Sequence, residues 1–278
     1  MNTLEYLQQI HALDRELIER VGAALPDAAR AAEAAAERLQ NSGRIFYLGA
    51  GTSGRLGVLD ASELSPTFGI DGNVVIALIA GGRDAMFISK EGAEDDARAA
   101  AAELDTYNLS ARDVVVGIAA SGATPYVIGG IEHARVRGCL TISIVCVRDS
   151  LLTKLSDVSI AVDAGPEILS GSTRMKAGTA QKLILNMFST AVARRLGLIY
   201  KGEMVAMRPS NAKLKKRAVR ILRDLLQVPE PRAAELLELS GSNLPVALVA
   251  GKWNLNVEQA RTKLQQKNGN VARALDEN

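Results

Sequence analysis

The sequence is poor in residues that mark several classes of protein. It holds two cysteines, Cys139 and Cys146, and two histidines in 278 residues, which is little for a disulfide framework or a metal site. Lys and Arg number 33 against 31 Asp and Glu, without the basic excess typical of nucleic-acid-binding proteins. No apolar run reaches the roughly 18 residues that span a bilayer, and the N-terminal segment lacks a signal-peptide core. We expect a cytoplasmic protein with buried, reduced thiols and no metal, nucleic-acid or membrane partner.

Short apolar runs alternate with helical stretches after two N-terminal helices predicted within residues 1–42. Continuous apolar strands separated by helices are typical of a doubly wound α/β sandwich with a mainly parallel, five-stranded sheet. The predicted strands are Ile45–Leu48, Val74–Ala80, Asp113–Ala119, Leu140–Val147 and Val158–Ala161. The predicted helices between and after them are Gly54–Ala61, Ile88–Leu104, Thr124–Val136 and Ser172–Leu196.

The C-terminal part of the chain has no strand signal after Leu214. We therefore predict an α/β domain with N-terminal helices over residues 1–213 and a small helical subdomain over residues 214–278, for which ubiquitin-associated-like packing is one candidate. Its two halves show a loose similarity, which is either a degenerate helix–turn–helix repeat or a chance match between amphipathic helix pairs. Ala233, Leu237, Leu244, Ala247 and Leu248 align with Ala260, Leu264, Val271, Ala274 and Leu275.

Three polar loops follow predicted strands: GAGTSG at Gly49–Gly54, ASGATP at Ala120–Pro125 and SGSTRMKAGTAQK at Ser170–Lys182. Glycines let a backbone approach a ligand closely, and hydroxyls and helix N-termini donate hydrogen bonds to phosphate. Each loop alone is better explained by ordinary helix caps and turns, for which Ser, Thr and Gly are favoured. Because parallel strands end at one edge of the sheet, the three loops together predict a phosphate-binding site.

The first loop also matches the G-x-G-x-x-G pattern of dinucleotide-binding proteins. Those proteins place an acidic residue at the end of the second strand to bind ribose. Here that strand ends in Ala77–Gly82 without a carboxylate, and Asp84 lies further on in a loop. The P-loop pattern G-x-x-x-x-G-K-[ST] does not occur. We expect a phosphorylated small molecule as ligand and no cofactor.

Ser/Thr/Gly loops on such a sandwich resemble the sugar isomerase (SIS) domain, which binds phosphosugars. Longer segments resemble the N-acetylmuramic acid 6-phosphate etherases: LGAGTSGRLGVLDASELSPTFG, EGAEDD, DVVVGIAASGATPYV and SGSTRMKAGTAQKLILNM. The resemblance implies a carbon–oxygen lyase that cleaves the D-lactyl ether of N-acetylmuramic acid 6-phosphate during peptidoglycan recycling. The products would be N-acetylglucosamine 6-phosphate and D-lactate. It also implies a homodimer with active sites near the interface.

Carried over residue by residue, the resemblance implies a phosphosugar site and an acid/base pair. The catalytic residues would be Glu63, as the acid on the lactyl oxygen, and Glu94, as the base at C2, with their order open. An elimination followed by addition of water needs both roles, and burial that raises a carboxyl pKa would suit them. The substrate-binding residues would be Thr52, Ser53, Ser121, Gly122, Thr124, Ser172 and Thr173.

Simpler explanations apply to both glutamates. Acidic residues near a helix start, such as Glu94 in EGAEDD, usually form a solvated face. Glu63 lies about 15 Å beyond Ser53 along an unbroken helix. It reaches the same sugar only if the helix ends early, as Ser62–Pro66 permit, or if a dimer shares the pocket.

Three departures from the family pattern bear on activity. Ala123 stands where the family has Arg in SGRTPYV, Ala206 stands where it has Asp before P-S-N, and the printed sequence begins after a family Thr-Glu-x-Arg-Asn motif. These departures favour a non-catalytic, phosphosugar-sensing protein like the glucokinase regulatory protein, whereas Glu63 and Glu94 favour the enzyme. A third interpretation is an aldose–ketose phosphosugar isomerase, which also deprotonates C2 but needs no acid at a C3 ether.

Overall fold

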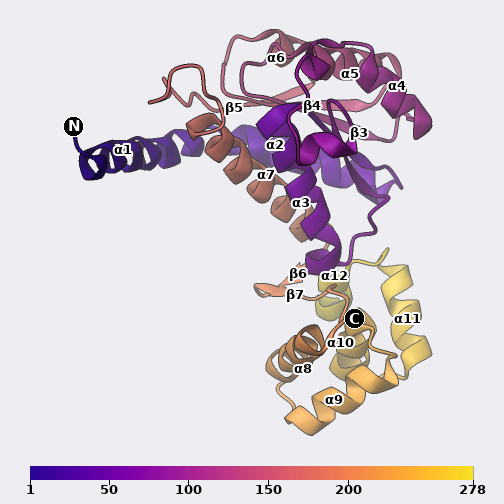
Figure 1. Ribbon diagram of the computed structural model, residues 1–278. Coiled ribbons are helices and arrows are strands. Elements are labelled where there is room, and N and C mark those ends of the chain that lie inside the picture. The colour runs from indigo at the N-terminus through magenta and orange to yellow at the C-terminus, as the bar shows by residue number, and fades with distance from the viewer. Residues whose placement is uncertain (278) are drawn as a thin grey trace. The chain divides into compact units, whose positions relative to one another are not determined.

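The five predicted strands form one parallel sheet in the computed structural model, which describes residues 1–277 (Figure 1). The order β2-β1-β3-β4-β5 places β1 between two later strands, so the winding of the chain reverses there. Ligands of open α/β sheets bind at the carboxyl ends of the strands beside such a reversal. The strands are β1 (Ile45–Gly49), β2 (Val75–Ile79), β3 (Val114–Ala119), β4 (Leu140–Val145) and β5 (Val158–Ala161).

Helices cover both faces of the sheet, which confirms the doubly wound sandwich (Figure 1). On one face, Gly117 of β3 lies against Val127 and Ile131 of α5 (Pro125–Val136). On the other face, Gly57 of α3 (Gly51–Phe68) lies against Tyr47 and Ile118. The other helices before residue 196 are α1 (Thr3–Gly22), α2 (Leu25–Gln40), α4 (Ala99–Thr106), α6 (Leu151–Leu155) and α7 (Lys176–Arg195), with 3-10 turns η1 (Arg83–Met86) and η2 (Ala93–Asp95).

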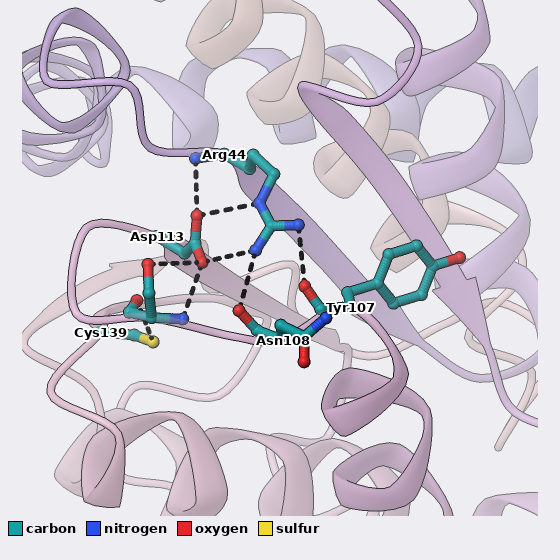
Figure 2. Close-up of polar contacts among 6 residues, drawn as sticks. Arg44, Tyr107, Asn108, Asp113 and Cys139 are labelled. Carbon is teal, nitrogen blue, oxygen red and sulfur yellow. Dashed lines mark hydrogen bonds and ion pairs between the residues drawn. The ribbon is translucent and has the colours of Figure 1, made fainter.

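A charged cluster closes the amino-terminal edge of the sheet, where Arg44 precedes β1 and Asp113 precedes β3 (Figure 2). The Asp113 carboxylate accepts hydrogen bonds from the Arg44 backbone N–H and Nη2, each at 2.9 Å, and from the Ser110 N–H at 2.8 Å. The Arg44 guanidinium also donates to the carbonyl oxygens of Tyr107 and Asn108. Burial alone raises the pKa of Asp113, but these hydrogen bonds outweigh it, so the pKa is lowered.

The chain divides into two compact units, Met1–Ser62 with Asn73–Ala191, and Glu63–Gly72 with Val192–Asn278. The predicted boundary at residues 213 and 214 therefore lies inside the second unit. This unit contains a short ribbon that was not predicted, β6 (Ile199–Tyr200) with β7 (Glu203–Met204). Its helices are α8 (Ala212–Leu226), α9 (Glu230–Leu239), α10 (Leu244–Trp253), α11 (Val257–Gln266) and α12 (Val271–Asp276).

The helix–turn–helix repeat is confirmed, because α9–α10 and α11–α12 follow the predicted alignment and all ten aligned residues are buried. Equivalent asparagines begin the second helix of each pair. The Asn243 side chain accepts a hydrogen bond from the Val246 N–H at 3.1 Å, and the Asn270 side chain accepts one from the Arg273 N–H at 2.9 Å. Matching caps and matching buried positions make the repeat a structural one.

The predicted helix Ile88–Leu104 is wrong over its first half. Gly92 adopts a φ of 74°, a left-handed conformation that ends a right-handed helix. The Asp96 carboxylate then accepts hydrogen bonds from the N–H groups of Arg98 and Ala99, which starts α4 only at Ala99. Residues 80–98 consequently form two 3-10 turns joined by loops.

Helix α3 is longer than predicted at both ends, and it continues through Pro66 to Phe68. Beyond that proline, the Gly69 N–H still donates to the Ser65 carbonyl at 2.9 Å, which closes the last turn. A proline this near a helix end removes few hydrogen bonds. The early helix end that would have let Glu63 approach the sugar is therefore wrong.

The two thiols are free, as predicted, with Cys139 buried and Cys146 half-buried. Burial raises the pKa of Cys139 to about 11 and that of Cys146 to about 12. Within residues 1–277, we find no helix with the length and apolar character that a membrane crossing requires.

Candidate active site

A cavity of about 360 Å³ lies at the carboxyl ends of β1 and β3. It brings together six of the nine predicted site residues: Thr52, Ser53, Ser121, Thr124, Thr173 and Glu94. Gly122, Ser172 and Glu63 are not among its lining residues. Asp95 also lines it and was not predicted. The two lining carboxylates have no cation beside them in the wall, so a bound phosphate would rely on neutral donors.

The first wall of the cavity is the beginning of α3. Ser53 is only 9% exposed, and its hydroxyl donates to Gln181 Oε1 on α7 at 2.8 Å. Gln181 is 1% exposed, and its Nε2 has no hydrogen-bond partner within residues 1–277. Reversing the amide would let Nε2 donate to Ser53, whose hydroxyl could then donate to a ligand. Gln181 is therefore the hydrogen-bond partner of the Ser53 side chain within the protein.

Gln181 was missed as a site residue, although a signal for it is present in the sequence. The apolar residues of α7 that share its helix face are buried, among them Ala177, Ile184 and Phe188. An amide at that spacing is a buried polar group that requires a partner. The sequence cannot show that this partner is Ser53, which is 128 residues away.

The second wall is the loop between β3 and α5. Thr124 is the N-cap residue of α5, yet its side chain makes no capping hydrogen bond. The Ser121 hydroxyl accepts a hydrogen bond from the Ala123 N–H at 3.2 Å. Gly122 has a φ of 65° and its Cα faces Ser150, so it shapes the loop from behind. With the start of a 12-residue helix beside these hydroxyls, the wall suits an anion.

The third loop contributes less than expected. Thr173 lines the cavity, but α7 begins only at Lys176, beyond the predicted start at Ser172. The Glu167 carboxylate accepts hydrogen bonds from the N–H groups of Lys176 at 3.1 Å and Ala177 at 2.9 Å. The expectation that the start of this helix offers free N–H groups is therefore wrong.

The two predicted catalytic glutamates lie in different parts of the structure. Glu94 lies in η2, is exposed, and lines both the main cavity and an adjoining one of about 220 Å³. Glu63 is exposed on α3 and belongs to the second unit. Along α3, about 15 Å separates the positions of Ser53 and Glu63.

A buried carboxylate ties α3 to α7 behind the cavity. Asp60 is 4% exposed and accepts hydrogen bonds from the Tyr47 hydroxyl at 3.0 Å, Asn186 Nδ2 at 3.0 Å and the Ser189 hydroxyl at 3.1 Å. Burial raises the pKa of Asp60, and these three donors oppose the rise. The network was not predicted, and it fixes the two helices that carry Ser53 and Gln181.

Helix α5 connects the second wall to the segment that carries Glu94. A Cβ atom on Gly129 would overlap the Ala97 carbonyl oxygen, so the helix and the segment are in direct backbone contact. The helix that begins beside Thr124 therefore also supports the chain just after Glu94.

Chemically, the cavity combines neutral hydrogen-bond donors with a solvent-accessible carboxylate that can transfer a proton. Residues 1–277 hold no group of three or more His, Cys, Asp or Glu side chains arranged to bind a metal ion.

Comparisons with known proteins agree with this architecture. Two family models match the chain: the glucokinase regulatory protein N-terminal SIS domain over residues 27–135 and the SIS domain over residues 97–191. A phosphoheptose isomerase from Francisella tularensis has a similar structure, with a TM-score of 0.55 and 19% identity over 70% of this chain and 100% of that one. The enzyme GmhA from Neisseria gonorrhoeae gives a TM-score of 0.53 at 16% identity, covering 69% and 100%. At these identities the likeness shows the fold alone.

Relatives that match nearly the full length of the chain share much higher sequence identity with it. The chain is 46% identical to the N-acetylmuramic acid 6-phosphate etherase of Lactobacillus gasseri, over 99% of this chain and 93% of that protein. It is 46% identical to N-acetylmuramic acid 6-phosphate etherase 2 of Vibrio cholerae, covering 100% and 90%. It is 42% identical to N-acetylmuramic acid 6-phosphate etherase 1 of Enterococcus faecalis, covering 99% and 92%.

Proposed function

The chain belongs to the N-acetylmuramic acid 6-phosphate etherase family, and from this we propose that it cleaves the D-lactyl ether of N-acetylmuramic acid 6-phosphate. The products are N-acetylglucosamine 6-phosphate and D-lactate, in the recycling of cell-wall amino sugars. The observation that carries the proposal is the single cavity shared by Glu94 and the hydroxyls of Ser53, Ser121, Thr124 and Thr173. This cavity supplies phosphate-binding hydroxyls and a proton-transfer group within one space.

We assign the phosphate to the walls at the starts of α3 and α5. Thr52, Thr124 and Thr173 support this assignment, because their hydroxyls make no hydrogen bond within residues 1–277 while they line the cavity. Hydroxyl and backbone donors at a helix start bind phosphate without a formal cation. Ala123 leaves the lining of this wall without a cation, which is consistent with such a site. Gly122 shapes the loop, and we keep Ser172 as a substrate-binding residue adjoining Thr173.

The reaction requires the sugar in its open form, whose C1 aldehyde acidifies the C2 proton. Glu94 takes that proton, the C2–C3 double bond forms, and the C3–O bond breaks. Glu63 gives a proton to the departing oxygen, so D-lactate leaves. Water then adds at C3 and a proton returns to C2, with the two glutamates exchanging roles. Two carboxyl groups therefore suffice for both half-reactions.

We propose that the active site is completed in a homodimer, with Glu63 supplied by the partner subunit. Support comes from the unbroken helix that separates Ser53 from Glu63 within one chain. Large apolar side chains also stand exposed on α1, namely Leu4 at 64%, Leu7 at 56% and Ile18 at 53%. Sedimentation equilibrium tests the dimer. We place it in the cytoplasm, which suits the two free thiols.

Incubation with N-acetylmuramic acid 6-phosphate and assay of D-lactate tests the activity. In deuterated water, we expect one deuteron at C2 of the product, since the proton there comes from solvent. Glu63→Gln and Glu94→Gln should each reduce lactate release by about a thousandfold. Phosphosugar binding without lactate would instead identify the sensing protein, which the family-model match over residues 27–135 keeps as the second candidate.

A further inference from the structure

A second cavity, of about 220 Å³, adjoins the candidate active site and shares Ala50, Gly51 and Glu94 with it. Arg55 and Lys90 line this smaller cavity but not the larger one. Glu94 therefore stands between a space lined by neutral donors and a space that contains two cations. The two spaces suit different parts of one ligand.

Arg55 is held in place without being neutralised. Its Nε donates to the Met86 carbonyl at 3.0 Å and its Nη2 donates to the Ala85 carbonyl at 2.8 Å. Within residues 1–277 it forms no ion pair with a carboxylate, although it is half-buried. A guanidinium has five N–H donors, so several stay available after these two bonds. Such a group is pre-organised for a carboxylate.

Lys90 is already engaged. Its Nζ donates to the Gly81 carbonyl at 2.8 Å and lies 3.5 Å from the Asp84 carboxylate. Glu91 lines the same cavity as Glu94, so two carboxylates face this space. An anionic ligand group would be repelled by both of them unless Arg55 compensated. Arg55 is thus the side chain on which anion binding here depends.

We propose that the smaller cavity binds the carboxylate of the lactyl arm through Arg55, an inference that rests on the proposed function. The ether oxygen of that arm is attached to C3, next to the C2 atom from which Glu94 takes the proton. A sugar ring in the main cavity with its arm beyond Glu94 presents the breaking bond at the boundary between the two spaces. Arg55 then selects the substrate over N-acetylglucosamine 6-phosphate, which has no arm.

The test compares two ligands that differ only in the arm. Arg55→Gln should lower kcat/KM for N-acetylmuramic acid 6-phosphate by roughly tenfold to hundredfold, as expected for loss of a charge-assisted hydrogen bond. The inhibition constant of N-acetylglucosamine 6-phosphate should change less than twofold. Arg55→Lys should recover part of the loss. Arg83→Gln, which changes an exposed arginine of η1 outside this cavity, is the matched control.

A substrate whose lactyl carboxylate is converted to an amide completes the test. The wild-type protein should lose a similar factor on this compound, and Arg55→Gln should lose little more. Equal losses for both sugar phosphates, or an undiminished effect of Arg55→Gln on the amide, would overturn the proposal. If the wild-type protein released no lactate, the proposed function would fail, yet the dissociation constants of the two sugar phosphates would still test the subsite.

Discussion

Both edges of the parallel sheet carry polar groups, but the groups have different partners. At the amino-terminal edge, Arg44 and Asp113 satisfy one another (Figure 2), and Asp157 accepts hydrogen bonds from the N–H and hydroxyl of Thr141, each at 2.8 Å. At the carboxyl-terminal edge, hydroxyls such as that of Thr124 face a cavity. Polar groups that find partners within the chain stabilise it, whereas those left facing a cavity are available to a ligand. Substitutions at the carboxyl-terminal edge should therefore lower activity, and substitutions at the amino-terminal edge should lower the free energy of unfolding.

The largest effect is expected at the carboxyl-terminal edge. Glu94→Gln should reduce lactate release by about a thousandfold, within the range for loss of a general acid–base group. Because Glu94 is exposed, the urea midpoint of unfolding should not move. D-lactate assay and urea titration measure the two quantities.

The matched control for this substitution is Glu132→Gln, an exposed glutamate on α5 outside the cavity. It should retain wild-type activity. A Glu94→Gln protein with full activity would remove Glu94 from the mechanism.

At the amino-terminal edge the pattern should reverse. Asp113→Asn leaves Arg44 without its buried partner and should lower the free energy of unfolding by about 3 kcal/mol. At urea concentrations below the unfolding transition, kcat should stay at the wild-type value, because Asp113 is at the edge opposite the cavity. Urea denaturation followed by circular dichroism gives the stability. A loss of kcat without a loss of stability would contradict the separation of the two edges.

The same carboxylate predicts a pH dependence. A folded-state pKa below the unfolded value contributes stability that is present above the unfolded pKa, near 3.9, and is lost as pH falls through the folded pKa. The stability difference between wild type and Asp113→Asn should therefore shrink below about pH 4. Urea midpoints of both proteins from pH 7 downward measure it. A difference that stayed constant down to the acid transition would show that Asp113 does not carry the effect.

The smallest effect is expected at Gln181. Its Oε1 is paired within the chain, like the groups of the amino-terminal edge, but its partner Ser53 lines the cavity. Gln181→Leu removes the partner of Ser53 and should raise KM by about tenfold with a smaller change in kcat, in keeping with one hydrogen bond. The same change removes a buried amide whose Nε2 has no hydrogen-bond partner within residues 1–277, so stability should stay equal or rise by about 1 kcal/mol. Steady-state kinetics and urea titration test both halves. Unchanged KM together with lower stability would make Gln181 a packing residue only.

The sequence predicted the sheet well because buried parallel strands are continuous apolar runs, and each of β1 to β5 lies within a residue or two of its predicted bounds. Prediction failed between Ile88 and Arg98, where Gly92 and the Asp96 carboxylate prevent the alanine-rich helix that follows from extending toward the N-terminus. It also failed for Gln181, because the contact with Ser53 depends on the packing of α3 against α7. Local sequence preferences determine helices and strands, whereas the candidate active site depends on contacts between segments that are distant in the sequence.

The contact between Gly129 and Ala97 has an evolutionary consequence. One hydrogen atom in place of a methyl group lets α5 approach the segment that follows Glu94. A mutation to alanine there would push α5 away from this segment and so displace the phosphate site relative to Glu94. We expect position 129 to tolerate no other residue, so that mutation of this codon would impair substrate affinity and turnover together, although Gly129 does not line the cavity.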